Sequence, residues 1–195
     1  MPRLPKITNE EILVAARQVF LEQGFGASTL EIAEKAGISE ASIFKRFITK
    51  QGLFLNSMGI TDQPQWSKVF AIPSRDIKTE LRDICKQMLK FHQETFPRVM
   101  MVMAQGNMPD VPLMPLPPVS DSQLLAEYLE RAIVLDYLHP CDSLTLAQLI
   151  VGAIINYVIA DNSANKHPFP EPFQSEPAEF IHKLIETLWT GIAPV

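Results

Sequence analysis

The chain has 195 residues, 47% of them apolar, which is enough for one large domain or two small ones with a buried core. Its formal net charge of −5 argues against a protein that coats nucleic acid without regard to sequence. Residues 1–58 hold seven Lys/Arg and six Asp/Glu, whereas the remainder holds ten and sixteen, so the amino-terminal part is the less acidic one.

The first predicted helix covers residues 8–24. Thr8 and Glu11 have the spacing of a capping box, and Gly24 is a helix stop. Four apolar residues recur at helical spacing and should pack on the helices that follow: Ile12, Ala16, Val19 and Phe20. We expect Phe25 to fill the corner behind them.

Residues 28–50 have the pattern of a helix-turn-helix. Ser28 and Glu31 have the spacing of a second capping box, Gly37 can turn the corner, and Ser39 can cap the next helix. The apolar side of the first helix of the motif is predicted to consist of Leu30, Ile32, Ala33 and Ala36.

In the second helix of the motif, Ile43 and Phe47 lie one turn apart and are predicted to be buried. The other residues of that helix are then free to enter a groove: Glu40, Ala41, Ser42, Phe44, Lys45 and Arg46. A fourth helix begins at Thr49 or Lys50 and ends near Gly59.

Beyond residue 60 the sequence predicts helices separated by proline-rich breaks. One helix covers about residues 76–95 and stops near Pro97, and a second covers about 98–105. The five prolines in residues 107–120 predict an irregular connection. Long loops of this kind are often functional. Cys85 and Cys141 have no metal-ligand spacing around them, which favours buried free thiols in a reducing cytoplasm.

Three more helices complete the prediction. Residues 121–138 are amphipathic, with an apolar side made of Leu124, Leu125, Tyr128, Leu129, Ala132 and Leu135. Residues 144–160 are apolar nearly all round, but they are shorter than the ~20 residues that a bilayer needs, so a buried helix is favoured. After a loop over 162–177, the last helix again has a wide apolar stripe. Two such helices predict a homodimer with a four-helix interface.

Residues 8–53 resemble the amino-terminal domain of TetR/AcrR-type transcriptional regulators. The resemblance rests on Gln23-Gly24-Phe25, Ala27-Ser28-Thr29-Leu30, Ile32-Ala33, Ala36-Gly37-Ile38-Ser39, Ile43-Phe44-Lys45-Arg46-Phe47 and Thr49-Lys50-Gln51-Gly52-Leu53. It implies an all-α fold with a helix-turn-helix DNA-binding domain at 1–50. An effector-binding and dimerisation domain would follow at 51–195, with the dimer formed through the last two helices.

The resemblance also implies which residues contact DNA. Thr29 and Lys50 match positions that touch phosphate. The positions that face the bases or the groove are matched by Ser39, Glu40, Ala41, Ser42 and Lys45, with Phe44 and Arg46 beside them.

Several roles stay open at this point. Lys45 can donate to guanine, and Ser42 can donate to a groove edge or a phosphate. Glu40 either accepts from cytosine or is there only because the helix dipole favours an acidic residue in the first turn. Phe44 stands where the family often has tyrosine, so a thymine methyl or a sugar suits it better than phosphate. Arg46 is either a solvated charge, a phosphate contact or, less favoured, a base contact.

A family of this kind usually senses a small molecule in its carboxyl-terminal helices. Large, soft side chains that could line a cavity are Trp66, Phe70, Met88, Phe91, His92, Phe96, Met100 and Met103. For each of them plain core packing is favoured over ligand contact. His92 on its apolar stripe needs a polar partner, and a core histidine with such a partner is favoured there. The composition predicts an effector that is largely apolar.

We therefore expect a cytoplasmic, homodimeric DNA-binding regulator, a repressor that a small effector releases from a palindromic operator. The amino terminus has no apolar signal segment. The four histidines are scattered and no glycine-rich phosphate loop or serine elbow occurs, so no enzyme, metal or cofactor is expected. The alternative is a helical ligand-binding or interaction protein without specific DNA binding.

Overall fold

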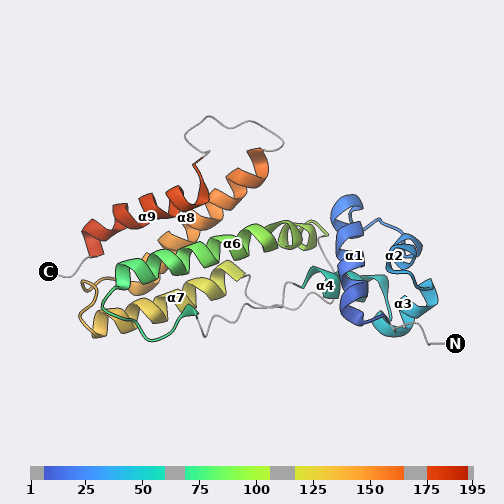
Figure 1. Cartoon of the computed structure of the whole chain (residues 1–195), viewed down its shortest axis with the longest axis horizontal. Coiled ribbons are helices and arrows are strands. Elements are labelled where there is room, and N and C mark those ends of the chain that lie inside the picture. Colours follow the sequence, from blue (N-terminus) through green and yellow to red (C-terminus); the bar gives the residue numbers. More distant parts are fainter. Residues whose placement is uncertain (1–6, 60–68, 106–116, 165–174, 193–195) are drawn as a thin grey trace. The chain divides into compact units, whose positions relative to one another are not determined.

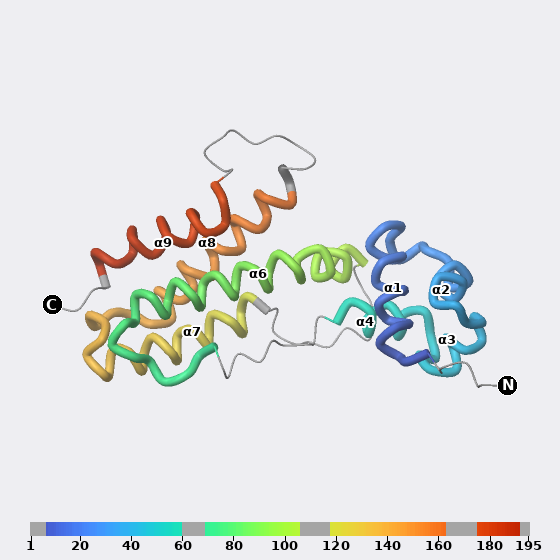
Figure 2. Tube along the Cα trace, viewed as in Figure 1, coloured from blue at the N-terminus to red at the C-terminus, as the bar shows by residue number. Residues whose placement is uncertain are grey.

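The computed structural model describes residues 7–59, 69–105, 117–164 and 175–192, and within these ranges the regular structure is helical, as predicted. Figure 1 and Figure 2 show the helices in chain order, coloured from blue to red. Their packing forms two units, which we describe separately. The first contains the described residues 7–59 and 95–105, and the second contains the rest.

The first unit is built on four short helices: α1 (Asn9–Gln23), α2 (Thr29–Ala36), α3 (Glu40–Phe47) and α4 (Lys50–Met58). Their buried side chains form one core of Ile12, Ala16, Val19, Phe20, Ala27, Ile32, Ala33, Ile43, Leu53, Phe54 and Met58. The ring of Phe25 packs at the predicted corner, stacked on Phe20 and edge-on to Phe54. Helix α4 packs with the helices before it. The boundary at residue 50 between a DNA-binding domain and an effector-binding domain stays a prediction.

Local capping signals fix the start of α1. The hydroxyl of Thr8 accepts from the Glu11 N–H at 3.2 Å, and the Glu11 carboxylate accepts from the Thr8 N–H at 2.7 Å, which confirms the capping box. The Thr8 contacts also lower the pKa of the Glu11 carboxyl. The carboxylate therefore stays ionised at the positive end of the helix dipole.

The start of α2 differs from the prediction. The Ser28 hydroxyl accepts from the Leu30 N–H at 3.2 Å, so Ser28 caps the helix, but Glu31 accepts from the Gln23 side chain at 2.5 Å instead of closing a capping box. Leu30 is exposed, whereas Ile32 and Ala33 are buried. The predicted capping box at Ser28 and the burial of Leu30 were therefore wrong.

The predicted break at Pro97 is also wrong, because one helix, α6 (Ile77–Met103), continues through it. Proline removes one N–H donor and can kink a helix without ending it. The buried stripe stays in register on both sides, at Leu81, Ile84, Cys85, Met88, Leu89, His92, Thr95 and Val102. In the first unit the Arg98 guanidinium donates to the carbonyl of Met58 at 3.1 Å.

The second unit combines the amino-terminal part of α6 with α7 (Pro117–Val134), α8 (Ser143–Ala164) and α9 (Pro177–Ile192). Only 117–120 of the predicted irregular segment 107–120 lie within the described residues, and they are helical. Helix α7 ends before Leu135, which is exposed, and Asp136 adopts a left-handed φ of 56°. The Tyr137 N–H then bonds the Ala132 carbonyl at 2.9 Å, which closes the helix earlier than predicted.

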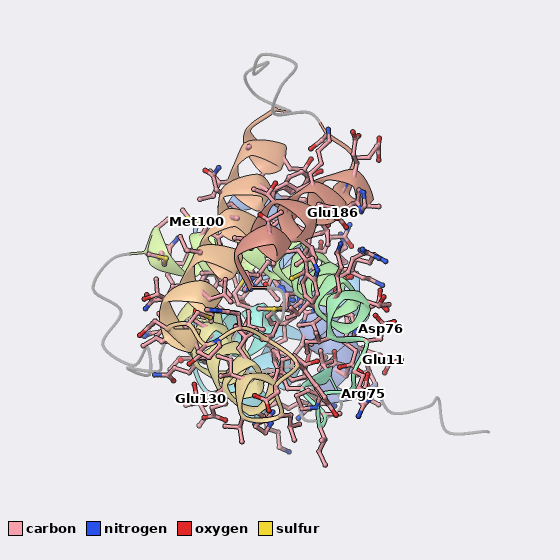
Figure 3. The ribbon with its side chains drawn as sticks, turned by 90° about the vertical axis from the view of Figure 1, so that its left-hand side faces the viewer. Glu11, Arg75, Asp76, Met100, Glu130 and Glu186 are labelled. Atoms are coloured by element: carbon pink, nitrogen blue, oxygen red, sulfur yellow. The ribbon has the colours of Figure 1, made fainter. Side chains whose placement is uncertain are left out.

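Polar contacts join the helices of the second unit. The Tyr128 hydroxyl of α7 donates to Glu80 of α6 at 2.6 Å, and this contact together with burial raises the pKa of the Tyr128 hydroxyl. The Glu186 carboxylate of α9, labelled in Figure 3, accepts from Lys78 at 2.7 Å and from Arg82 at 3.3 Å. These contacts also lower the pKa of Glu186.

Helix α8 packs against α7 and is long and apolar enough over residues 143–162 to span a membrane by length and composition. A single such helix is weak evidence for a membrane span, because core helices pass the same test. Of that stretch, 39% is buried within this single chain. Leu149 and Ile159 are among its exposed residues.

The two cysteines are free thiols, but only one is buried as predicted. Burial raises the pKa of the Cys85 thiol to about 12, so it stays protonated. Cys141 is exposed because it lies in the connection between α7 and α8, so its predicted burial was wrong.

Candidate nucleic-acid interface

The helix-turn-helix orients α3 by its two ends and its buried side. Gly37 adopts the left-handed φ of 68° that closes α2, and the Ser39 hydroxyl accepts from the Ser42 N–H at 3.3 Å at the start of α3. Ile43 is fully buried, as predicted, whereas Phe47 packs against the core but is only half-buried. The opposite side of α3 is thereby turned to solvent.

The solvent side of α3 is a stripe of Ala41, Phe44 and Lys45, spaced by three and four residues. All three side chains are exposed. Within the described part of the chain, Lys45 has no hydrogen-bond or ion-pair partner, so its ammonium is available to an external acceptor. Ser42 lies at the edge of this stripe, where its hydroxyl contacts that of Ser39 at 2.8 Å.

Glu40 has a partner that the sequence did not reveal. Its carboxylate accepts a hydrogen bond from the Thr29 hydroxyl, which ties the start of α3 to the start of α2. The predicted phosphate-contacting hydroxyl of Thr29 is thus engaged within the protein. The backbone N–H groups in the first turn of α2 remain suited to an anion.

Arg46 is turned toward α1. Its guanidinium donates to the carbonyl of Ile7 at 2.9 Å and to the side chain of Asn9 at 3.2 Å. These contacts fix α3 against the start of α1, an alternative that the sequence analysis did not consider. The three roles considered for Arg46, a solvated charge, a phosphate contact and a base contact, each require that its guanidinium has no partner within the protein.

Lys50 begins α4, where Thr49 caps the helix by accepting from the Gly52 N–H at 2.9 Å. The Lys50 ammonium lies 5.1 Å from the centre of the Phe25 ring, within cation–π range. This contact leaves the ammonium hydrogens able to meet a phosphate beside the first N–H groups of α4. The predicted phosphate role of Lys50 fits this geometry and stays a prediction.

An unusual turn joins α3 to α4. The Thr49 N–H bonds the Phe47 carbonyl at 2.6 Å, and Ile48 between them has φ 64° and ψ −53°, the geometry of a γ-turn with positive φ. A Cβ atom at position 52 would lie 2.6 Å from the same Phe47 oxygen, so Gly52 provides the space for this carbonyl. Sequence analysis missed Ile48, because no composition signal marks a left-handed isoleucine.

Five of the six predicted effector-contacting residues lie on α6 within the described residues, and the rings of Phe91 and His92 are in contact, with centroids 5.4 Å apart. Trp66 lies outside the described residues. In the second unit, Met88 and His92 are buried and Phe91 is half-buried. Met100 and Met103 belong to the first unit and are exposed, and Figure 3 shows Met100 at the surface.

His92 has the polar partner that the sequence analysis required. Its Nε2 lies 3.0 Å from Oδ2 of Asp121 on α7, and both side chains are buried. The contact is a close pairing of the two groups rather than a well-directed hydrogen bond. Asp121 was missed because no periodicity identifies which carboxylate of a later helix meets a buried imidazole.

The described residues of the second unit form two cavities, and none of the described effector candidates, Met88, Phe91, His92, Met100 and Met103, lines either of them. One, of about 300 Å³, lies between α6, α7 and residues 69–72 and contains the carboxylates of Glu80 and Asp83. The other, of about 420 Å³, lies between α7 and α8 and has no charged lining residue. Its walls are Pro118, Val119, Ser122, Gln123, Leu144, Gln148, Val151, Gly152 and Ile155.

Known proteins resemble the chain most strongly in the first unit. Residues 12–56 match the family described as bacterial regulatory proteins, tetR family. Over 47 residues the chain is 55% identical to the uncharacterized HTH-type transcriptional regulator YvkB of Bacillus subtilis, covering 24% of this chain and 25% of YvkB. Over 59 residues it is 46% identical to the HTH-type transcriptional repressor BepR of Brucella suis, covering 30% and 28% of the two chains.

The chain therefore spans about a quarter of the length of the curated relatives it matches. Over nearly its whole length, the chain is similar to solved structures in fold. The crystal structure of a TetR-family transcriptional regulator from Pectobacterium atrosepticum aligns with a TM-score of 0.62 at 19% identity, covering 96% of this chain and 95% of that one. At that identity the likeness concerns the fold.

Proposed function

We propose, from the premise that residues 12–56 belong to the TetR family of bacterial regulatory proteins, that the protein is a sequence-specific DNA-binding repressor. It binds a palindromic operator as a homodimer, and a small, largely apolar effector releases it. The effector acts by binding the conformation with the lower operator affinity, which shifts the population toward that conformation.

The observation that carries this proposal is the exposed stripe of α3. Ala41, Phe44 and Lys45 face solvent on a helix whose other charged residues, Glu40 and Arg46, are engaged within the protein. A helix presented in this way fits the major groove, where side chains read base edges. Lys45 is the donor best placed to contact guanine O6 and N7.

The exposed apolar side of α8 supports the proposed homodimer. Leu149 and Ile159 are exposed in the single chain on a helix that is otherwise apolar. A two-fold axis through α8 and α9 would bury these residues against a second copy. The same axis would present two copies of α3 to two half-sites, which gives the palindromic readout its specificity.

The uncharged cavity between α7 and α8 is the best-supported effector site. Its apolar walls and its two amide side chains, Gln123 and Gln148, suit a neutral ligand with one or two hydrogen-bonding groups. The earlier set of Trp66, Met88, Phe91, His92, Met100 and Met103 stays a prediction.

Selection of bound sequences from a random duplex pool, with the full chain at near-physiological salt, tests the function. We expect one palindrome to be enriched, with affinity that falls as salt rises because Lys/Arg contacts release counterions. A folded, dimeric protein that enriches no sequence and binds all duplexes weakly would support the alternative, a helical ligand-binding or interaction protein.

A further inference from the structure

We propose that Ile48 contacts the operator directly and recognises the C5-methyl group of a thymine in the major groove. This inference rests on the proposed DNA-binding function and adds a specificity-determining residue to it. It also assigns a thymine methyl group to the half-site, a feature that the ammonium of Lys45 cannot recognise by hydrogen bonding.

Ile48 follows Phe44 by four residues and Ala41 by seven, so its backbone lies at the carboxyl end of α3, one turn beyond Phe44. The Phe44 carbonyl accepts from the Ile48 N–H at 3.0 Å, which keeps Ile48 in the helical hydrogen-bond pattern as the cap residue. Exposed apolar side chains thus continue from Ala41 and Phe44 of α3 into the turn at Ile48, three residues after Lys45.

The backbone conformation of Ile48 is unfavourable for this residue type. A β-branched side chain with φ 64° is a steric outlier, and a γ-turn of this hand is rare and strained. Glycine or asparagine would relieve the strain at this position. Such strain occurs mainly at functional sites, where the rest of the structure maintains it.

Internal packing does not explain an isoleucine in this turn. The side chain is 82% exposed, so its burial within the chain offsets little of the conformational cost. The two ends of the turn are nevertheless fixed, by Phe47 against the core and by Thr49 at the cap of α4. The turn therefore presents an apolar side chain to solvent from a well-defined backbone.

The chemistry of the groove identifies the partner. Base edges in the major groove present hydrogen-bond donors and acceptors, and the thymine C5-methyl is their apolar feature. A branched aliphatic side chain cannot satisfy the donors and acceptors, but it can bury the methyl. Lys50, two residues after Ile48, begins the first turn of α4, and the phosphate contacts predicted there would hold Ile48 against the duplex.

The experiment begins with the duplex that the full-length wild-type protein selects from a random pool. Each thymine of one half-site is replaced in turn by deoxyuridine, which lacks only the C5-methyl, and dissociation constants are measured for wild type, Ile48→Gly and Ile72→Ala. Ile72 is also 82% exposed but belongs to the second unit, so its variant is the matched control. Thermal unfolding of each variant verifies folding.

We expect one deoxyuridine substitution to weaken wild-type binding about fourfold, the change that burial of one methyl group is worth. In Ile48→Gly the same substitution should have no effect, while Ile72→Ala should respond like wild type. Ile48→Gly should also unfold at no lower temperature than wild type, because glycine relieves the positive φ.

A selected half-site without thymine overturns the inference alone, and so does an Ile48→Gly protein that retains the full response to every deoxyuridine. A weaker affinity of Ile48→Gly that does not depend on thymine methyls also overturns it, since that result indicates sugar contact. A wild-type protein that enriches no duplex overturns the proposed function itself.

Discussion

The hydroxyl of Thr29 donates a hydrogen bond to the carboxylate of Glu40, so the first residues of α2 and α3 are joined by their side chains. Both residues match positions expected to contact DNA. Their mutual contact ties the starts of the two helices together. We expect Glu40 to place a negative charge near the proposed operator without reading a base.

Glu40→Gln is expected to keep this contact, because the amide oxygen can still accept from Thr29. Loss of one exposed negative charge should strengthen operator binding by less than about fivefold, since such a charge interaction is worth roughly 0.2–1 kcal/mol. Base preference, measured by repeating the duplex selection, should stay unchanged. An altered base in the selected half-site would show that Glu40 reads cytosine.

Lys45→Ala is expected to weaken operator binding by about 1–3 kcal/mol and to relax the preference at one guanine. The reason is that Lys45 is exposed on the groove-facing stripe and has no partner among the described residues. Lys90→Ala, which removes an exposed lysine from α6, is the charge-matched control for fluorescence-anisotropy titrations. Equal affinities for the two variants would remove Lys45 from the reading role.

Arg46→Ala should reduce stability rather than sequence preference. It removes the charged hydrogen bonds to Ile7 and Asn9, which together are worth about 1–3 kcal/mol. Urea unfolding measures the loss, and duplex selection should return the wild-type palindrome. A stable variant with a changed palindrome would instead place Arg46 against a base.

Leu149→Glu should convert the dimer into a monomer, because it would bury a charge in the interface proposed along α8. Leu149 is 59% exposed in the single chain, so the folding of the chain itself should be affected little. Val134→Glu, at an even more exposed apolar position at the end of α7, is the control. Sedimentation velocity distinguishes the outcomes, and a dimeric Leu149→Glu protein would place the interface elsewhere.

His92→Leu should destabilise the second unit by about 3 kcal/mol, because it removes one partner of a buried pair. The double variant His92→Leu/Asp121→Leu should recover part of this loss. We expect a coupling energy of at least about 1 kcal/mol from a double-mutant cycle in urea. Additive effects of the two substitutions would show that His92 and Asp121 do not stabilise each other.

The parts of the fold that the sequence predicts well depend on local interactions. The capping box of Thr8 and Glu11, the left-handed Gly37 and the cap at Ser39 each involve residues close along the chain, and all three are confirmed. The stop predicted at Pro97 failed because tertiary packing along α6 outweighs the loss of one backbone hydrogen bond.

The candidate site was predicted less completely, for a related reason. Which residues lie on α3 follows from periodicity, but whether a charged side chain is available to DNA depends on partners distant in sequence. Arg46 bonds residues at the start of α1, and Glu40 bonds Thr29. The left-handed φ of Ile48 depends on the space left by a glycine four residues later, and no local propensity reports it.

The narrow space above Gly52 makes positions 48 and 52 epistatic. Alanine at 52 would press on the Phe47 carbonyl that closes the turn at Ile48, so it is tolerated only where that turn has already opened. The order of substitutions is therefore constrained along any evolutionary path through this segment. Relatives that diverge at one of the two positions are expected to covary at the other.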